Sequence, residues 1–125
     1  MTNRENKKPT ILICDDEEGI RESFKLILED QYDLRFATNG LEAIEMLKSF
    51  TPALMLLDIK MPKMHGLEIL KQIKEARPVL PIIIVTGYQS VEMAQEALKC
   101  GAIDYIPKPF ESQEILKAVL NVLPG

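Results

Sequence analysis

Long apolar stretches are absent from this sequence of 125 residues. No run is long enough to cross a membrane, and no signal-peptide pattern begins the chain. An excess of positive charge is also absent, since the formal net charge is −4, which argues against direct nucleic-acid binding by this domain. We therefore expect a cytoplasmic protein that contacts neither a membrane nor nucleic acid through this domain.

Cysteine and histidine are scarce as well. Cys14 and Cys100 show neither metal-ligand spacing nor a C-x-x-C pattern, so we expect two buried free thiols in a reducing compartment. His65 is the single histidine and precedes Gly66 in an expected loop. We expect His65 to be an exposed loop residue rather than a metal ligand.

Short apolar runs alternate with stretches of helical periodicity five times along the chain. The expected strands are residues 10–14, 32–37, 53–57, 82–86 and 102–106. The run at 32–37 alternates polar and apolar residues, which is typical of a strand at the edge of a sheet. Ser90 is the expected cap of the fourth helix, and Gly101 is its expected end.

This order of elements predicts a doubly wound α/β fold, because strand–helix alternation gives parallel strands joined by right-handed crossovers. The length suits one domain, and the sequence shows no internal linker or repeat. We expect a flexible N-terminal arm over residues 1–9 and the folded domain over residues 10–122. Residues 123–125 are expected to form a tail or the start of a linker.

One unbroken apolar run, residues 53–57, ends at Asp58. A short run without polar breaks is typical of a strand buried on both faces of a parallel sheet. Ligands of open α/β sheets bind at the carboxyl ends of the strands, where Asp58 would lie. Taken alone, however, the start of an ordinary turn is the simpler interpretation of this residue.

Other polar residues follow the neighbouring strands at the same edge of the expected sheet. Asp15 and Asp16 follow the first strand, Thr86 ends the fourth, and Lys108 follows the fifth. Close carboxylates repel one another, and Mg²⁺, which binds carboxylates and water and commonly works beside phosphate, would relieve that repulsion. Lys108 and the Thr86 hydroxyl would then contact phosphoryl oxygens, and Asp58 would be the nucleophile that forms an aspartyl phosphate.

Each of these residues also has an ordinary structural interpretation. Thr86 is β-branched and fits a strand end, Lys108 is compatible with a solvated loop, and Asp15 is compatible with a helix cap. Their coincidence at one edge of the sheet favours the chemical interpretation, because the structural ones would have to occur together by chance.

The sequence resembles the receiver domain of bacterial two-component response regulators. The motifs that carry the resemblance are Asp15-Asp16-Glu17, the segment 57–66, Val85-Thr86-Gly87 and the segment 104–110. The resemblance extends from about Thr10 to about Leu120. It implies a flavodoxin-like, five-stranded parallel sheet in the order 2-1-3-4-5 with five helices, and a signalling switch that phosphorylation activates.

The resemblance implies that Asp58 accepts a phosphoryl group from a phosphohistidine on a sensor histidine kinase or a histidine phosphotransfer protein. Thr86 and Lys108 would contact the phosphoryl oxygens, so these three residues form the expected catalytic set. Enzymatic activity would be limited to self-phosphorylation from a phosphodonor and to autodephosphorylation.

The implied cofactor is Mg²⁺, for which Mn²⁺ can substitute. Asp16, Asp58 and the backbone carbonyl of Lys60 would bind the ion directly. Asp15 would act largely through metal-bound water. The resemblance therefore divides the expected metal site between the loops that follow the first and third strands.

Tyr105 is the implied switch aromatic, and the bond between Lys108 and Pro109 is expected to be cis. Thr86 would move toward the phosphoryl group, and the ring of Tyr105 would fill the space behind it. The surface of the fourth helix, fifth strand and fifth helix would change and so control an output. A phosphorylation-dependent homodimer is among the implied assemblies.

Lys60 and Tyr88 stand two residues after Asp58 and Thr86, where they would flank the path of an attacking water. We expect them to influence the lifetime of the phosphoryl group, and plain solvent exposure is the alternative. Gly87 departs from the Ala or Ser often found after the threonine in this family. Because glycine is also small, access to Asp58 should survive.

Two other functions stay open at this point. A Mg²⁺-dependent phosphatase that acts on a small phosphate ester through an aspartyl phosphate would use the same residue types. Such enzymes resemble one another through a D-x-D pattern after the first strand, which is missing here. A purely structural module that has lost phosphorylation would have no need for the acid pair together with Asp58, Thr86 and Lys108.

Overall fold

The computed structural model describes residues 8–60 and 66–123, so residues 1–7, 61–65 and 124–125 lie outside the described chain. Five strands alternate with five helices in this part. The strands are β1 (Thr10–Cys14), β2 (Asp33–Ala37), β3 (Leu54–Leu57), β4 (Ile82–Thr86) and β5 (Asp104–Pro107). The helices are α1 (Glu18–Leu28), α2 (Gly40–Met46), α3 (Gly66–Ala76), α4 (Val91–Lys99) and α5 (Ser112–Leu120).

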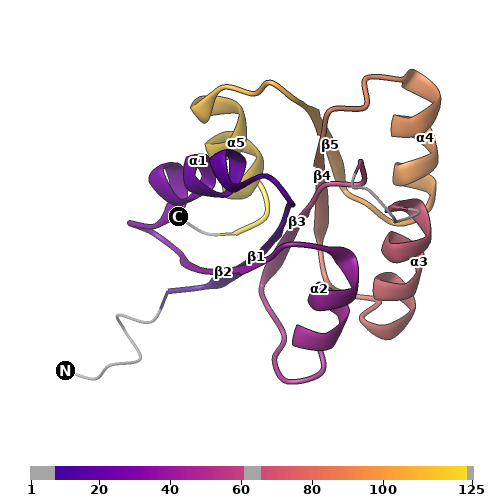
Figure 1. Ribbon diagram of the computed structural model, residues 1–125, viewed down its shortest axis with the longest axis horizontal. Helices are drawn as coiled ribbons and strands as arrows, with labels where there is room; N and C mark the ends of the chain where they lie inside the picture. Colours follow the sequence, from indigo (N-terminus) through magenta and orange to yellow (C-terminus); the bar gives the residue numbers. More distant parts are fainter. Residues whose placement is uncertain (1–7, 61–65, 124–125) are drawn as a thin grey trace.

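The strands form one parallel sheet in the order β2-β1-β3-β4-β5, which confirms the expected doubly wound topology. Helices α1 and α5 cover one face, and α2, α3 and α4 cover the other (Figure 1). Successive side chains of β1 point to opposite faces of the sheet. Ile11 and Ile13 pack with α1 and α5, while Leu12 and Cys14 pack with α2 and α3. The central strands β3 and β4 are buried throughout, whereas β2 has the mixed burial expected of an edge.

Most expected element ends are confirmed, with small shifts. Ser90 caps α4 by accepting a hydrogen bond from the Met93 N–H at 3.2 Å, and Gly101, with φ of 112°, follows the end of that helix. The expected strand at 102–106 is observed at Asp104–Pro107. The reason is that the N–H of Ala102 donates to the carbonyl of Ala97 and still belongs to the end of α4.

The chain ends were expected to be an arm and a tail, and most of those residues lie outside the described part. The carbonyl of Pro9 accepts a hydrogen bond from the Asp33 N–H at 2.9 Å, and Leu123 is buried against α5. The domain boundaries at residues 10 and 122 stay predictions. In the described residues, no helix has the length and apolarity that a membrane span requires.

Gly66, the first residue of α3, lies against the segment that follows β3. A Cβ added to Gly66 would lie 2.3 Å from the carbonyl oxygen of Ile59 and 2.4 Å from its Cβ. These atoms belong to the residue directly after Asp58, so the contact holds α3 against the candidate site. Any side chain here would displace the backbone beside that aspartate.

We expect Gly66→Ala to lower the free energy of unfolding by about 1–3 kcal/mol, because overpacking against backbone cannot be relieved by a rotamer change. The matched control is Gly19→Ala in α1, where an added Cβ meets nothing within 4 Å. The control should raise the free energy of unfolding by about 0.4–1 kcal/mol, since alanine restricts the unfolded chain. Denaturant unfolding of both variants measures the difference, and equal stabilities would contradict it.

Candidate phosphoryl-acceptor and metal site

The sheet itself places the candidate residues on one edge. Asp15 directly follows β1, Asp58 follows β3, Thr86 ends β4 and Lys108 follows β5, and these four strands are neighbours in the sheet. The strand ladder continues one residue past the strand ends, because the Asp58 N–H donates to the carbonyl of Cys14 at 3.0 Å. In the same way, the Lys108 N–H donates to the carbonyl of Thr86 at 2.8 Å. The sheet therefore fixes the backbone of these residues.

Lys108 is the centre of the charged cluster at this edge. Its ammonium nitrogen lies 2.8 Å from Oδ2 of Asp15, 3.0 Å from Oδ2 of Asp58 and 3.0 Å from Oε1 of Glu17. The side chains of Asp15, Asp58 and Lys108 are only 2%, 4% and 11% exposed, whereas that of Glu17 is 61% exposed. The structure thus brings Asp15, Asp58 and Lys108 together at nearly buried positions.

Burial and charge shift the pKa values in this cluster in opposite directions. Burial raises the pKa of Asp15, although the Lys108 ammonium and the N–H of Glu17 oppose the shift. Burial would lower the pKa of Lys108, but its close contacts with the Asp15, Asp58 and Glu17 carboxylates outweigh this and raise it. Lys108 therefore stays positive at neutral pH and offsets part of the negative charge.

The acidic residues at this edge have the composition of a site for a hard cation. Carboxylate oxygens of Asp15, Asp16, Glu17 and Asp58 all lie within 4.8 Å of one another. Oδ2 of Asp15 is buried and has no hydrogen-bond partner among the described residues, although it lies 2.8 Å from the Lys108 ammonium. Mg²⁺ prefers such oxygen ligands together with water, so these residues fit the expected ion. The role of the Lys60 carbonyl stays a prediction.

Thr86 is fully buried at the end of β4, and its hydroxyl is held loosely. Within the described part of the chain, Oγ1 accepts one long hydrogen bond, of 3.5 Å, from the N–H of Tyr88. A hydroxyl with one weak partner can rotate toward a stronger acceptor at little cost. The Thr86 hydroxyl is therefore free to donate a hydrogen bond at the carboxyl end of the strands, where Asp58 also lies.

The two residues expected to influence phosphoryl lifetime contact each other. Nζ of Lys60 lies 5.4 Å from the centroid of the Tyr88 ring, in a cation–π contact. The stem of Lys60 passes over Gly87, where an added Cβ would lie 3.6 Å from Cδ of Lys60. Lys60 and Tyr88 thus form a connection between the loops that follow β3 and β4.

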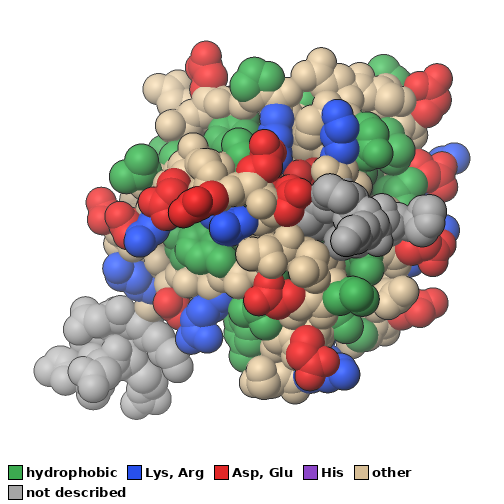
Figure 2. All heavy atoms as spheres, in the orientation of Figure 1, with side chains coloured by type: hydrophobic (Ala, Val, Ile, Leu, Met, Phe, Trp, Pro, Cys, Tyr) green, Lys and Arg blue, Asp and Glu red, His purple; other side chains and the backbone are tan. Residues whose placement is uncertain are grey.

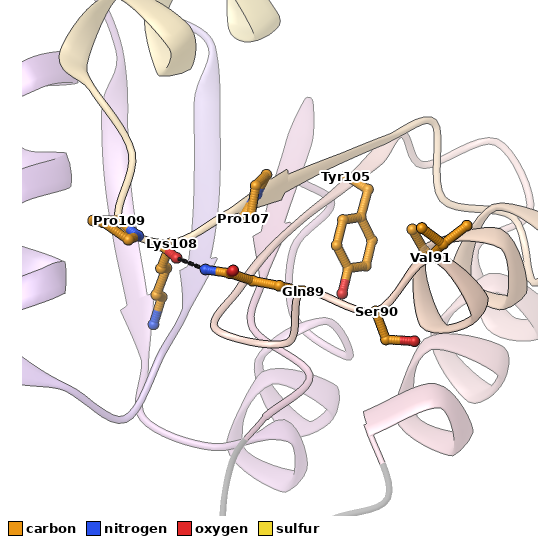
Figure 3. A pocket seen from close by; sticks show the side chains of 8 residues that line it. Gln89, Ser90, Val91, Tyr105, Pro107, Lys108 and Pro109 are labelled. Atoms are coloured by element: carbon orange, nitrogen blue, oxygen red, sulfur yellow. Dashed lines mark hydrogen bonds between the residues drawn. The ribbon is translucent and has the colours of Figure 1, made fainter.

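Tyr105 and Gln89 connect the loop after β4 with β5 and the loop after it. The Tyr105 hydroxyl donates to the carbonyl of Tyr88 at 2.8 Å. The Gln89 side-chain amide donates to the carbonyl of Lys108 at 2.7 Å (Figure 3). Tyr105, Gln89 and Val91 line a cavity of about 410 Å³ between α4 and the end of β5, and the Lys108–Pro109 bond beside it is cis, as expected.

Sequence reasoning assigned no role to Glu17, although it quoted this residue as part of the acidic motif. The available signal was a third acid directly after the acid pair.

The expectations about the two cysteines and the single histidine have different outcomes. Cys14 is buried, and burial followed by the charge of Asp15 raises its thiol pKa, but Cys100 at the end of α4 is partly exposed, so the expectation of two buried thiols was wrong for Cys100. His65 lies outside the described residues.

Comparison with known proteins decides the family. The family model described as "Response regulator receiver domain" matches residues 11–120, nearly the whole chain. This chain is a receiver domain. Receiver domains belong to response regulators of two-component systems, and as a class they take phosphoryl groups from histidine kinases and bind Mg²⁺ at an acidic pocket.

The curated relatives of this receiver domain are longer than the chain. It is 39% identical over 114 residues to the response regulator MprA of Mycobacterium ulcerans, covering 90% of the chain and 49% of the relative. It is 39% identical over 114 residues to the regulatory protein AtoC of Escherichia coli, covering 90% of the chain and 25% of that relative. The chain therefore spans about half or less of the length of these proteins.

Solved structures support the same conclusion about the fold. A CheY-like receiver domain of Methanospirillum hungatei has a TM-score of 0.86 at 35% identity, covering 92% of this chain and 93% of that one. The BeF₃-activated receiver domain of DrrB has a TM-score of 0.84 at 25% identity, covering 94% of this chain and 99% of that one. These values confirm the receiver fold expected from the sequence.

We expect Lys108→Met to lower the free energy of unfolding by about 2–4 kcal/mol at pH 7 without divalent cations, since it leaves two nearly buried carboxylates without a counter-charge. The pKa of Lys108 is raised in the folded state. Its stabilisation is therefore fully present below the ordinary lysine pKa of about 10.4, and is lost as the pH rises through the higher folded value.

Denaturant unfolding of the wild type, Lys108→Met and the control Lys117→Met at several pH values tests this expectation. Lys117 is exposed on α5, so its replacement should change stability by less than about 0.5 kcal/mol. Added Mg²⁺ should restore part of the stability of Lys108→Met, because a cation again faces the carboxylates. Equal stability of the two variants would contradict the importance of the buried ammonium.

Proposed function

We propose that this receiver domain is a phosphorylation-activated switch whose phosphoryl acceptor is Asp58. The single observation that carries the proposal is the position of Asp58, which is 4% exposed at a strand end, with Oδ2 3.0 Å from the Lys108 ammonium. A carboxylate beside a fixed cation and further oxygen ligands is well placed to attack phosphorus. The donor would be a phosphohistidine on a sensor histidine kinase or on a histidine phosphotransfer protein.

In the proposed reaction, an Asp58 oxygen forms a bond to phosphorus while the bond between phosphorus and the donor's histidine nitrogen breaks. Phosphoryl transfer depends mainly on positioning and on neutralising charge, and Lys108 and the Thr86 hydroxyl supply both. Asp16, Asp58 and the Lys60 carbonyl would hold Mg²⁺, or Mn²⁺ in its place, with Asp15 acting through water. The ion, when bound, would offset the charge of the carboxylates and the phosphoryl oxygens.

The proposed switch runs from Thr86 to Tyr105. Phosphorylation adds about −1.5 to −2 charge at Asp58, which would attract the loosely held Thr86 hydroxyl. Tyr88 follows two residues later, and its carbonyl accepts the hydrogen bond of the Tyr105 hydroxyl. Movement of Thr86 would therefore disturb that bond and allow the ring of Tyr105 to shift inward.

The proposed output surface comprises α4, β5 and α5. Apolar side chains are already exposed on these helices, including Leu98 of α4 at 46% and Leu120 of α5 at 49%. A change of Tyr105 within this surface would alter its affinity for a second copy of the chain or for another target. We also propose that the protein is cytoplasmic and that this domain contacts neither a membrane nor nucleic acid. The face in Figure 2 carries acidic and basic side chains interspersed with apolar ones.

We expect the chain to incorporate at most one phosphoryl group from acetyl phosphate in the presence of Mg²⁺, and Asp58→Asn to abolish this labelling because an amide oxygen is a poor nucleophile. The control is Asp104→Asn, at the start of β5 and thus at the opposite edge of the sheet. Intact-mass measurement reads the result. Labelling of Asp58→Asn, or sustained turnover of a small phosphate ester, would overturn the proposal in favour of another acceptor or a phosphatase.

We expect Lys60→Ala and Tyr88→Ala each to accelerate autodephosphorylation about 2–5-fold. This factor corresponds to the free energy of one exposed cation–π contact, which we expect to shield the site from water. Because the two side chains contact each other, the double variant should not show the product of the single effects. Tyr88→Phe keeps the ring and should keep the wild-type rate. Decay of the phosphorylated protein gives these rates, and unchanged rates in both alanine variants would contradict the expectation.

A further inference from the structure

Glu17 stands at the N-cap of α1 but does not act as a cap. The N-cap side chains of α2 and α4, Asn39 and Ser90, accept hydrogen bonds from backbone N–H groups of their own helices. The Glu17 side chain makes no such bond, and instead its Oε1 lies 3.0 Å from Nζ of Lys108, which is 91 positions away in sequence. The backbone of Glu17 is fixed separately, because its N–H donates to Oδ1 of Asp15 at 2.9 Å. The carboxylate is therefore directed at the site by a fixed backbone.

The Lys108 ammonium faces three carboxylates and donates hydrogen bonds to two of them, Glu17 and Asp58. An ammonium group has three N–H donors, and three carboxylates lie within 3.0 Å of this one. Two of them, Asp15 and Asp58, come from nearly buried side chains next to the sheet. The third, Glu17, comes from a side chain that is 61% exposed and has room to leave.

A phosphoryl group on Asp58 brings further acceptor oxygens to Lys108, which then compete with the present partners of the ammonium. Phosphorylated Asp58 no longer carries a carboxylate charge, so its contact with Lys108 passes to the phosphoryl group. Of the two carboxylates that stay charged, Asp15 is nearly buried, so only the exposed Glu17 can leave Lys108 without stranding a buried charge. An anionic Glu17 beside a phosphoryl group would also be repelled by it.

We propose that the Glu17 carboxylate is a stand-in for the phosphoryl group: it accepts a hydrogen bond from Lys108 in the resting protein and is displaced when a phosphoryl group arrives on Asp58. Glu17 is thus a positioning residue that acts through Lys108. It keeps the ammonium directed at the site and competes with the incoming anion. The inference rests on the proposed phosphorylation of Asp58.

The test uses beryllofluoride with Mg²⁺ as the probe, because BeF₃ activates the structurally similar DrrB receiver domain. We expect Glu17→Gln to bind beryllofluoride about two- to fivefold more tightly than the wild type, because this factor corresponds to the free energy of one partly exposed ion pair. Glu17→Asp keeps the charge but is one methylene too short to keep the contact, and it should show the same gain. Glu18→Gln removes a neighbouring charge at the start of α1 and should show less than a twofold change. Fluorine NMR titration measures all four affinities.

The outcomes separate the possible roles. A gain in Glu17→Gln without a gain in Glu17→Asp would show that only the local charge matters and would overturn the stand-in role. A loss of magnesium affinity in both variants, with no gain for beryllofluoride, would assign Glu17 to the metal and also overturn it. Unchanged affinities in both variants would overturn this inference alone. Failure of the wild type to bind the probe would overturn the proposed function together with it.

Discussion

The ion contacts of Lys108 with Asp15 and Asp58 are the constraint on which the rest of this site depends. Each of these groups is nearly buried, and a buried charge without a partner costs several kcal/mol. The ammonium therefore has to remain where both carboxylates can reach it. The same arrangement leaves the cluster short of positive charge, since four acids face one lysine, and this deficit favours a divalent cation as a partner.

The parallel sheet supplies the accuracy that such a cluster requires. The N–H groups of Asp58 and Lys108 continue the strand ladder to Cys14 and Thr86, so these residues leave the sheet at positions set by its register. Gly66 adds a second restraint, because its missing side chain lets α3 rest on the backbone of the residue after Asp58. Functional residues that stand on rigid elements in this way are held more accurately than residues in free loops.

The sequence was sufficient for the features that depend on strand order and strand ends. Asp58, Thr86 and Lys108 could be brought to one edge because apolar runs, followed by polar residues, mark where buried strands stop. Contacts between loops could not be predicted in the same way. The direction of the Glu17 side chain depends on the backbone angles at the start of α1, with φ of −96° and ψ of 119°, and on a loop 91 positions away. The shift of β5 to Asp104 likewise depends on how α4 ends, because a hydrogen bond holds Ala102 to that helix.

The hydrogen bonds around Lys108 also explain why a change at Asp58 would travel toward α4 and β5. Three hydrogen bonds connect the end of β4 and the loop after it with β5 and the segment that follows β5. The Lys108 N–H donates to the carbonyl of Thr86, the Gln89 amide to the carbonyl of Lys108, and the Tyr105 hydroxyl to the carbonyl of Tyr88. Rotation of the Thr86 hydroxyl alone leaves these bonds intact, but a shift of the Thr86 backbone toward a phosphoryl group would strain them. The cavity between α4 and β5 gives the tied segments space to rearrange. Open space beside a segment lowers the cost of displacing it, so we expect phosphorylation to move α4 and the loop before it.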